Sequence, residues 1–490
     1  MHRFGHLAGD CVLEHTHGVN LPAMNDPSSP QGAHSGPEPD NVPSAHLGSN
    51  RASHPADNPP DRPPDGTDRA TGSEPGSEAS GPRWKLVGPG LVVAATGIGA
   101  GDLIATLVAG SRFGYTLLWA AVAGVLIKIA LVEGAGRFTL ATGRTIFEGW
   151  RSLGVWTAIY FGPYIIVWGF VYGAAAMSST ALPLNALFPG VPIWVFAGIS
   201  GLMGAAIVWY GKYKAFEYII AFFVGLMFLT VVGSAIVTVP NLAEIARGMI
   251  PTIPEGALIY TLGIAGGVGG TITLAAYGYW LREKGWSTPR WMRVMRIDNS
   301  VAYVMSGIFV VAMLIVGAEL LYSAQITIAD GDAGLVDLAE VLGDRYGTFM
   351  AYFFLIGFWA SSFSSILGVW NGVSIMFADY LGVLRGLPED DSRRRLGGTY
   401  YKGYIVWLTI PPMALLLLGR PIGLIVAYGV LGSLFMPFLA ATLLLLLNSR
   451  HVPKQWRNGW LLNSIMVAVL AIFVTLGINE LVGALSPLFS

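Results

Sequence analysis

Long apolar runs recur along most of the chain, from about residue 87 to residue 485. A helix needs about 20 apolar residues to cross the hydrocarbon core of a bilayer, and most of these runs are of that length. They predict eleven membrane-spanning helices, near residues 87–110, 115–136, 154–182, 191–210, 215–239, 257–281, 299–322, 347–376, 403–419, 422–447 and 459–485. We therefore expect an all-α protein that crosses the membrane many times.

The bulk composition agrees with this pattern. Hydrophobic residues make up 53% of the 490 positions and charged residues only 12%, whereas a soluble domain is about 25% charged. The single cysteine, Cys11, excludes a disulfide framework within one chain. A net charge of −1 gives no basis for nucleic-acid binding.

The N-terminal segment, residues 1–83, has a different character. It is rich in Pro, Ser, Gly and Asp and lacks the apolar residues that offset chain entropy, so we predict a disordered tail. Seven of the eight histidines lie in this segment, but their irregular spacing favours a solvated linker over a metal site. Residues 84–490 then form the transmembrane domain.

Basic residues predict the orientation. Lys and Arg cluster in alternate connections, represented by Arg144, Lys212, Arg290, Arg394 and Arg450, and the intervening connections are nearly free of them. Cytoplasmic loops of membrane proteins carry this excess of positive charge. We therefore predict a protein of the cell membrane with its N-terminus in the cytoplasm and, after eleven spans, its C-terminus outside.

Two spans share an unusual glycine cluster. Span one contains "TGIGAGDLIATLVAG" and span six contains "LGIAGGVGGTITLAAYG". They open two successive sets of five spans, about residues 87–239 and 257–447, and residues 459–485 form an extra helix. Because five is odd, the second set enters from the opposite side, giving an inverted repeat. Glycine-interrupted spans at matching positions indicate a transporter's substrate site, although glycines also serve close helix packing.

Several motifs resemble one family. "GPGLVVAATGIGAGDLIATLVAGSRFGYTLLW", "GRFTLATGRTIFEGW", "YKAFEYIIAFFVG", "RGMIPTIPEG", "ASSFSSILGVWNG" and "LFMPFLAATLLLLLNSR" are similar to segments of the natural resistance-associated macrophage protein (Nramp) family of divalent-metal transporters. The resemblance implies the LeuT-type fold, with two inverted five-helix repeats, one extra helix, and broken helices at spans one and six. It also implies transport of a divalent metal ion.

The metal-binding motifs of the family are altered here. Its Asp-Pro-Gly-Asn motif aligns so that Gly99 stands at the metal-binding Asp and Asp102 at the Asn. Gly270 stands at the family's metal-binding Met in span six. The family's Gln in span eight aligns with Phe363 and its span-ten counterpart with Gly429. The resemblance therefore supports the fold more strongly than the cargo.

Asp102 is the candidate charge of this altered site. An ionisable group within a membrane span is a functional hypothesis by default. With Asp102 we group Thr96, Gly99, Gly267, Gly270, Thr271 and Thr273 as candidate binding residues. Such an all-oxygen site suits Mg²⁺, Mn²⁺ or Ca²⁺, held with part of its hydration shell. The alternatives are a structural, hydrogen-bonded aspartate and threonines bonded to their own helix backbone.

Coupling to protons would use carboxylates, because the predicted spans contain no histidine. The candidates are Glu133, with Arg137 four residues later on the same helix face, and Glu217. Glu148, Asp298 and Glu319 are further acidic positions near the span ends. A structural ion pair is the competing explanation for each, so the sequence leaves proton coupling open.

The leading hypothesis is a secondary transporter of divalent metal ions, of the Mn²⁺, Fe²⁺ and Mg²⁺ class, that works by alternating access around the two breaks. A same-fold transporter of a small organic or monovalent solute is one alternative, since the glycine-lined sixth span leaves room for it. A non-transporting membrane receptor is another. No enzyme motif is present. We expect a monomer in the lipid bilayer, with the transported ion or solute as its partner and no resident cofactor.

Overall fold

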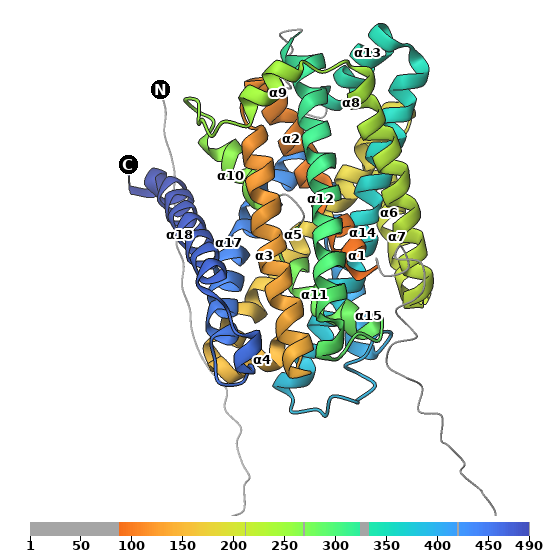
Figure 1. Ribbon diagram of the computed structural model, residues 1–490. Helices are drawn as coiled ribbons and strands as arrows, with labels where there is room; N and C mark the ends of the chain where they lie inside the picture. Colours follow the sequence, from red (N-terminus) through yellow and green to blue (C-terminus); the bar gives the residue numbers. More distant parts are fainter. Residues whose placement is uncertain (1–87, 211, 268–269, 324–332, 419–420, 490) are drawn as a thin grey trace, which may run out of the picture. The chain divides into compact units, whose positions relative to one another are not determined.

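The computed structural model describes residues 88–210, 212–267, 270–323, 333–418 and 421–489 (Figure 1). Its secondary structure within these ranges is helical, without strands. The predicted disordered tail, residues 1–83, lies outside the described residues.

The helices of the first predicted repeat run in chain order with short connections. They are α1 (Pro89–Gly97), α2 (Ala100–Phe113), α3 (Leu118–Thr142), α4 (Ile146–Leu153), α5 (Val155–Leu187), α6 (Ile193–Tyr210), and the continuous run α7 (Tyr213–Met227), η3 (Phe228–Val232) and α8 (Gly233–Val237). The short helix α9 (Leu242–Gly248) leads to the second repeat.

The second predicted repeat follows the same plan. Its helices are α10 (Leu258–Gly267), α11 (Thr273–Glu283), η4 (Pro289–Trp291), α12 (Met292–Val316) continued by η5 (Gly317–Tyr322), α13 (Ala333–Tyr346), α14 (Thr348–Leu384), α15 (Thr399–Thr409), α16 (Met413–Leu416) and α17 (Pro421–Leu447). After η6 (Lys454–Trp456), α18 (Trp460–Phe489) is the predicted extra helix.

Six helical segments in the described ranges are long and apolar enough to cross a membrane. They are Leu118–Thr142, Val155–Leu187, Ile193–Tyr210, Tyr213–Val237, Pro289–Tyr322 and Thr348–Leu384. The predicted first and sixth spans are absent from this set because each is divided into two shorter helices. The total of eleven spans stays a prediction.

Both divisions fall at the glycine clusters. The first span is interrupted at Ile98 and Gly99, where the backbone is extended (Gly99 φ −111°, ψ −166°). The second interruption follows α10, and Gly270 there has a φ of +90°, a conformation that residues with a Cβ rarely adopt. Glycine therefore weakens the helix at one break and permits a special backbone conformation at the other.

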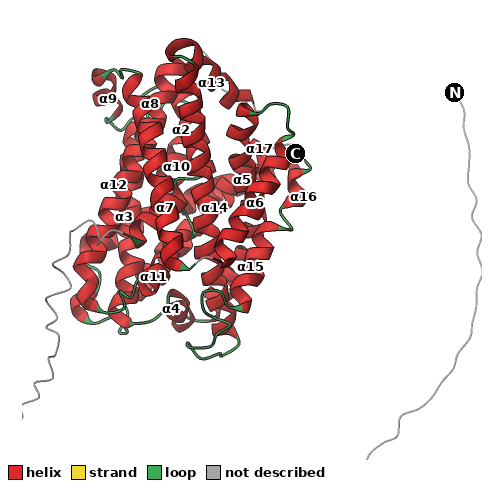
Figure 2. Cartoon of the chain, turned by 90° about the vertical axis from the view of Figure 1, so that its right-hand side faces the viewer, coloured by secondary structure: helices red, strands yellow, loops and turns green. Residues whose placement is uncertain are grey.

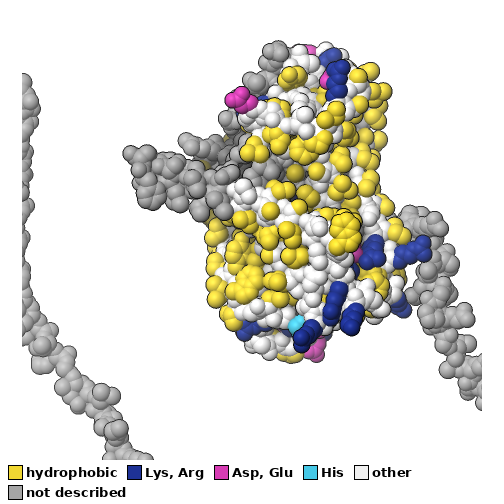
Figure 3. Space-filling model, turned by 60° about the vertical axis from the view of Figure 1, so that its left-hand side comes forward, with side chains coloured by type: hydrophobic (Ala, Val, Ile, Leu, Met, Phe, Trp, Pro, Cys, Tyr) yellow, Lys and Arg dark blue, Asp and Glu magenta, His cyan; other side chains and the backbone are white. Residues whose placement is uncertain are grey.

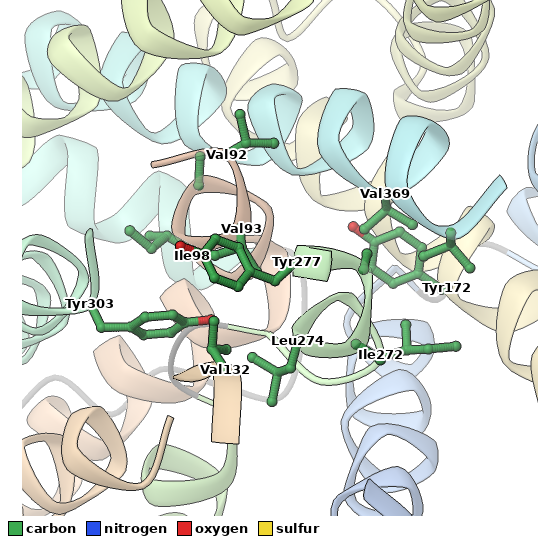
Figure 4. Packing of buried hydrophobic residues seen from close by; sticks show 14 of the residues in the cluster. Val92, Val93, Ile98, Val132, Tyr172, Ile272, Leu274, Tyr277, Tyr303 and Val369 are labelled. Carbon is green, nitrogen blue, oxygen red and sulfur yellow. The ribbon is translucent and has the colours of Figure 1, made fainter. Parts of the chain in front are cut away.

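The breaks lie inside a packed core. Helix α1 packs against α11, α12 and α14, and α11 packs against α3 and α14; Figure 2 shows the all-helical bundle from the side. Ile98 of the first break and Ile272 of the second are both buried and lie among the hydrophobic side chains of Figure 4. Apolar side chains therefore surround both breaks.

The outer surface is apolar where the helices are long. Large side chains such as Leu126, Ile159, Phe222 and Ile236 are exposed. Figure 3 shows hydrophobic side chains across the middle of one face, with most Lys and Arg side chains toward one end. Exposed apolar surface on this scale is expected of a protein whose sides contact lipid.

Candidate cation site at the helix breaks

The two breaks lie against each other. A Cβ placed on Gly270 would lie 3.1 Å from the Cα of Gly97 and 2.6 Å from the hydroxyl oxygen of Thr273. The absence of a side chain at Gly270 thus brings the backbones of α1 and the second break together. Glycine at position 270 therefore allows the two backbones to touch, and it does not leave space for a large solute. Residues 268–269 of the same glycine cluster lie outside the described residues.

Serine hydroxyls of α14 satisfy the carbonyl groups freed at the first break. Ser365 donates to the carbonyl of Thr96 at 2.8 Å, and Ser361 donates to the carbonyl of Ile98 at 2.7 Å. The hydroxyl groups of Tyr172 and Ser365 lie 2.8 Å apart. All of these side chains are buried, so uncharged hydroxyl groups satisfy the carbonyls of the first break inside the bundle.

The same serine explains why glycine occupies position 99. A Cβ on Gly99 would overlap the hydroxyl oxygen of Ser365. Any residue can adopt the extended backbone conformation of Gly99, so lack of space, and not conformation, excludes a larger residue at this position. An aspartate at this position, as in the family motif, would need Ser365 to move.

A lysine occupies the second break. The ammonium group of Lys128, from the middle of α3, donates to the carbonyl of Gly270 and lies 3.5 Å from the sulfur of Met436 in α17. Lys128 is completely buried. Lys128 is not among the predicted site residues, although "VLIKIALVE" carries this one base in an apolar run. A lone ionisable residue in a span was the signal that could have identified it.

The three candidate threonines differ in their bonding. The hydroxyl of Thr96 donates to the carbonyl of Val93 at 2.6 Å, which is the backbone bonding expected of a structural threonine. The hydroxyls of Thr271 and Thr273 have no hydrogen-bond partner among the described residues, and their residues are only 6% and 2% exposed. Thr273 is the first residue of α11, and Thr271 directly follows Gly270 in the connection before it.

Helix boundaries locate the remaining candidates. Asp102 is in the first turn of α2, immediately after the first break, and its side chain lies outside the described residues. Gly267 is the last residue of α10. Phe363 is buried in α14 and packs in an aromatic cluster with Phe223 and Trp359. No group of three or more His, Cys, Asp or Glu side chains capable of holding a metal occurs among the residues that the structure describes.

The carboxylates considered for coupling form ion pairs. Arg137 Nε lies 3.1 Å from Glu133, which confirms the predicted pair, and Arg296 lies 2.9 Å from the other oxygen of the same carboxylate. Glu217 of α7 lies 2.5 Å from Lys284 after α11. The Glu133–Arg137 pair lies within α3, whereas the pairs with Arg296 and Lys284 connect different elements of the bundle.

Asp298 connects α12 to the start of α1. Its carboxylate accepts hydrogen bonds from the backbone N–H groups of Gly88 and Gly90, at 2.8 and 2.6 Å, and from the hydroxyl of Tyr277 at 2.7 Å. A carboxylate at a helix N-terminus satisfies the free amides and complements the helix dipole. Asp298 therefore fixes the end of α1 that is remote from the break.

Comparison with known proteins identifies the family. The family model described as "Natural resistance-associated macrophage protein-like" matches residues 90–483. This chain belongs to the Nramp family. The divalent metal cation transporter MntH of Mycobacterium leprae is 26% identical over 318 residues, covering 60% of this chain and 70% of that protein. The metal transporter nramp1 homolog of Dictyostelium discoideum is 24% identical over 310 residues, covering 60% and 56%.

Solved structures agree on the fold. A mutant of the manganese transporter of Eremococcus coleocola superimposes with a TM-score of 0.69 at 17% identity, covering 84% of this chain and 90% of that one. The predicted fold class is thus confirmed as an all-α, LeuT-type membrane protein with interrupted first and sixth spans. Its relatives are transporters and not enzymes, so this Nramp protein is a multi-pass membrane transporter.

Proposed function

We propose that this Nramp protein carries divalent cations of the hard class, such as Mn²⁺, Mg²⁺ or Ca²⁺, across the cytoplasmic membrane by alternating access. The observation that supports this most strongly is the contact between the two breaks. It brings backbone carbonyls together, in an apolar interior, with two threonine hydroxyls that have no hydrogen-bond partner in the described part of the chain. Irregular backbone at membrane depth is tolerated where it is buried in protein or lines a pathway.

The donor atoms favour hard ions. Carbonyl and hydroxyl oxygens surround the breaks, and the residue aligned with the family's metal-binding Met is Gly270. Oxygen donors suit Mg²⁺, Ca²⁺ and Mn²⁺, whereas thioether sulfur suits softer metals. With Thr271, Thr273 and the carboxylate of Asp102 as ligands, the ion would keep part of its hydration shell. Weak discrimination between Mn²⁺ and Mg²⁺ follows from this donor set.

Alternating access would move the broken helices against the rest of the bundle. The start of α1 is bound to Asp298, and Glu217 pairs with Lys284 close by. These contacts join α1, α7, α11 and α12 at the end that we propose to be cytoplasmic. They would separate when the site opens on that side.

The test is uptake of Mn²⁺ by proteoliposomes that contain the purified protein. We expect accumulation in the wild type and a reduction of about tenfold or more in Asp102→Asn, because a carboxylate is the strongest oxygen ligand for a hard cation. Glu244→Gln is the matched control, since Glu244 lies in an exposed pair with Arg247 on α9. Absence of uptake of Mn²⁺, Mg²⁺ and Ca²⁺ would contradict the proposal. Equal uptake by wild type and Asp102→Asn would remove Asp102 from the site.

A further inference from the structure

Lys128 places a positive charge inside the bundle, at the second break. The residue lies near the middle of α3, between Ile127 and Ile129, and is completely buried. Lysine is rare at such depth because its ammonium group loses its hydration. A buried lysine is retained where specific contacts or a function offset that cost.

The contacts of the ammonium group include two uncharged atoms. One is the carbonyl oxygen of Gly270, a residue whose backbone at φ +90° departs from the helix. The other is the sulfur of Met436, 3.5 Å away. Backbone carbonyls at a helix break coordinate cations in transporters. The ammonium group therefore occupies a place suited to a cation.

We infer that Lys128 is a resident cation, which competes with the transported cation for the carbonyl of Gly270 and lowers the affinity of the site for divalent ions. This inference rests on the proposed transport of divalent cations. A divalent ion at the breaks and the ammonium group repel each other, and the repulsion is strong because little water screens charges in a buried site. Lys128 thus determines how much positive charge the site accepts.

A purely structural lysine would behave differently. If Lys128 only satisfied the Gly270 carbonyl, its removal would lower stability without improving cation binding. A resident cation gives the opposite sign in the binding measurement, because its removal makes space and relieves repulsion. Divalent-cation affinity therefore separates the two roles, whatever happens to stability.

The experiment is calorimetric titration of the purified full-length protein with Mn²⁺. We expect Lys128→Met, which keeps the length of the side chain and removes the charge, to bind Mn²⁺ about tenfold more tightly or better. Lys128→Arg keeps the charge and should bind as weakly as the wild type. Lys402→Met is the matched control: its ammonium group lies 5.0 Å from the centre of the Trp209 ring, away from the breaks, so affinity should not change.

Each result decides the inference. Equal or weaker Mn²⁺ binding by Lys128→Met would overturn it, while wild-type binding would leave the proposed function intact. Failure of both proteins to bind Mn²⁺, Mg²⁺, Fe²⁺ and Ca²⁺ would overturn the inference and the proposed function together. Should Lys128→Met not fold, Lys128→Gln carries the same test, because its amide group can still donate a hydrogen bond to the Gly270 carbonyl.

Discussion

The two helix breaks satisfy their freed carbonyl groups by different means. At the first break, the uncharged hydroxyl groups of Ser361 and Ser365 donate to the carbonyls of Ile98 and Thr96. At the second, the ammonium group of Lys128 donates to Gly270. Each half of the inverted repeat therefore contains a break, but uncharged groups donate at the first and a charged group donates at the second. We interpret the serine contacts as the support of the first break and Lys128 as a group that limits the positive charge of the cargo.

Gly99→Asp would disturb the first break, where serine hydroxyls bond the backbone, and should have the largest effect on stability. Its carboxylate would meet the hydroxyl of Ser365, and both crowding and an added buried charge oppose folding. We expect a loss of about 3 kcal/mol in the free energy of unfolding, measured as a fall in the thermal unfolding midpoint in detergent.

The double variant Gly99→Asp, Ser365→Gly is the control for this substitution. Removing the serine side chain clears the space, so part of the lost stability should return. If the single variant Gly99→Asp is as stable as the wild type, Ser365 does not explain the glycine at position 99.

Gly270→Ala tests the backbone conformation of the second break, where Lys128 donates its hydrogen bond. The substitution adds a Cβ at φ +90°, 2.6 Å from the Thr273 hydroxyl and 3.1 Å from Gly97. We expect a cost of about 2 kcal/mol, by the same unfolding measurement. Gly263→Ala in α10 is the matched control: a Cβ there meets nothing within 4 Å, and alanine favours the helix by about 1 kcal/mol. Equal effects of the two substitutions would refute a special role for Gly270.

Ser361→Ala and Ser365→Ala test how firmly the hydroxyl groups hold the first break. Each removes one hydrogen bond to a backbone carbonyl, and side-chain hydrogen bonds in membrane proteins contribute about 0.6 kcal/mol on average. Each variant should lower the free energy of unfolding by about that amount and leave Mn²⁺ affinity unchanged. A marked change in affinity would show that these hydroxyl groups, or the carbonyls that they bind, also ligate the ion.

Thr271→Val should have the smallest effect on stability and a clear effect on binding. The Thr271 hydroxyl has no protein partner among the described residues, so its replacement by a methyl group should change stability by less than about 0.5 kcal/mol. Mn²⁺ affinity should fall by about threefold to tenfold, because one oxygen ligand is lost.

Thr261→Val provides the contrast for this substitution. Its hydroxyl donates to the carbonyl of Ala257 at 2.8 Å, so the variant should lose about 0.6 kcal/mol of stability and keep its affinity for Mn²⁺. The reverse pattern, with binding lost in Thr261→Val and retained in Thr271→Val, would place the ion elsewhere.

The sequence predicts the fold well because span length and glycine placement are local signals. The runs around Gly99 and Gly270 mark both breaks to within a few residues, and the spacing of Glu133 and Arg137 predicts their ion pair. These features depend on residues close together in the chain or on the period of one helix.

Contacts between distant helices could not be predicted in this way. Ser365 meets Thr96 across 269 positions, and Lys128 meets Gly270 across 142. The rotation and register of each helix decide such contacts, and a single sequence does not fix either. The role of the serines therefore emerges only from the packed bundle. Lys128, in contrast, was visible as a charge within a span, although its partner was not.

The most direct test of this account is the position of Mn²⁺ in crystals of Lys128→Met, determined by anomalous scattering. We predict one peak between the starts of α2 and α11, within about 2.0–2.6 Å of the Gly270 carbonyl oxygen, and weaker occupancy of the same place in the wild type. A peak away from both breaks, or a stronger peak in the wild type than in the variant, would contradict the account.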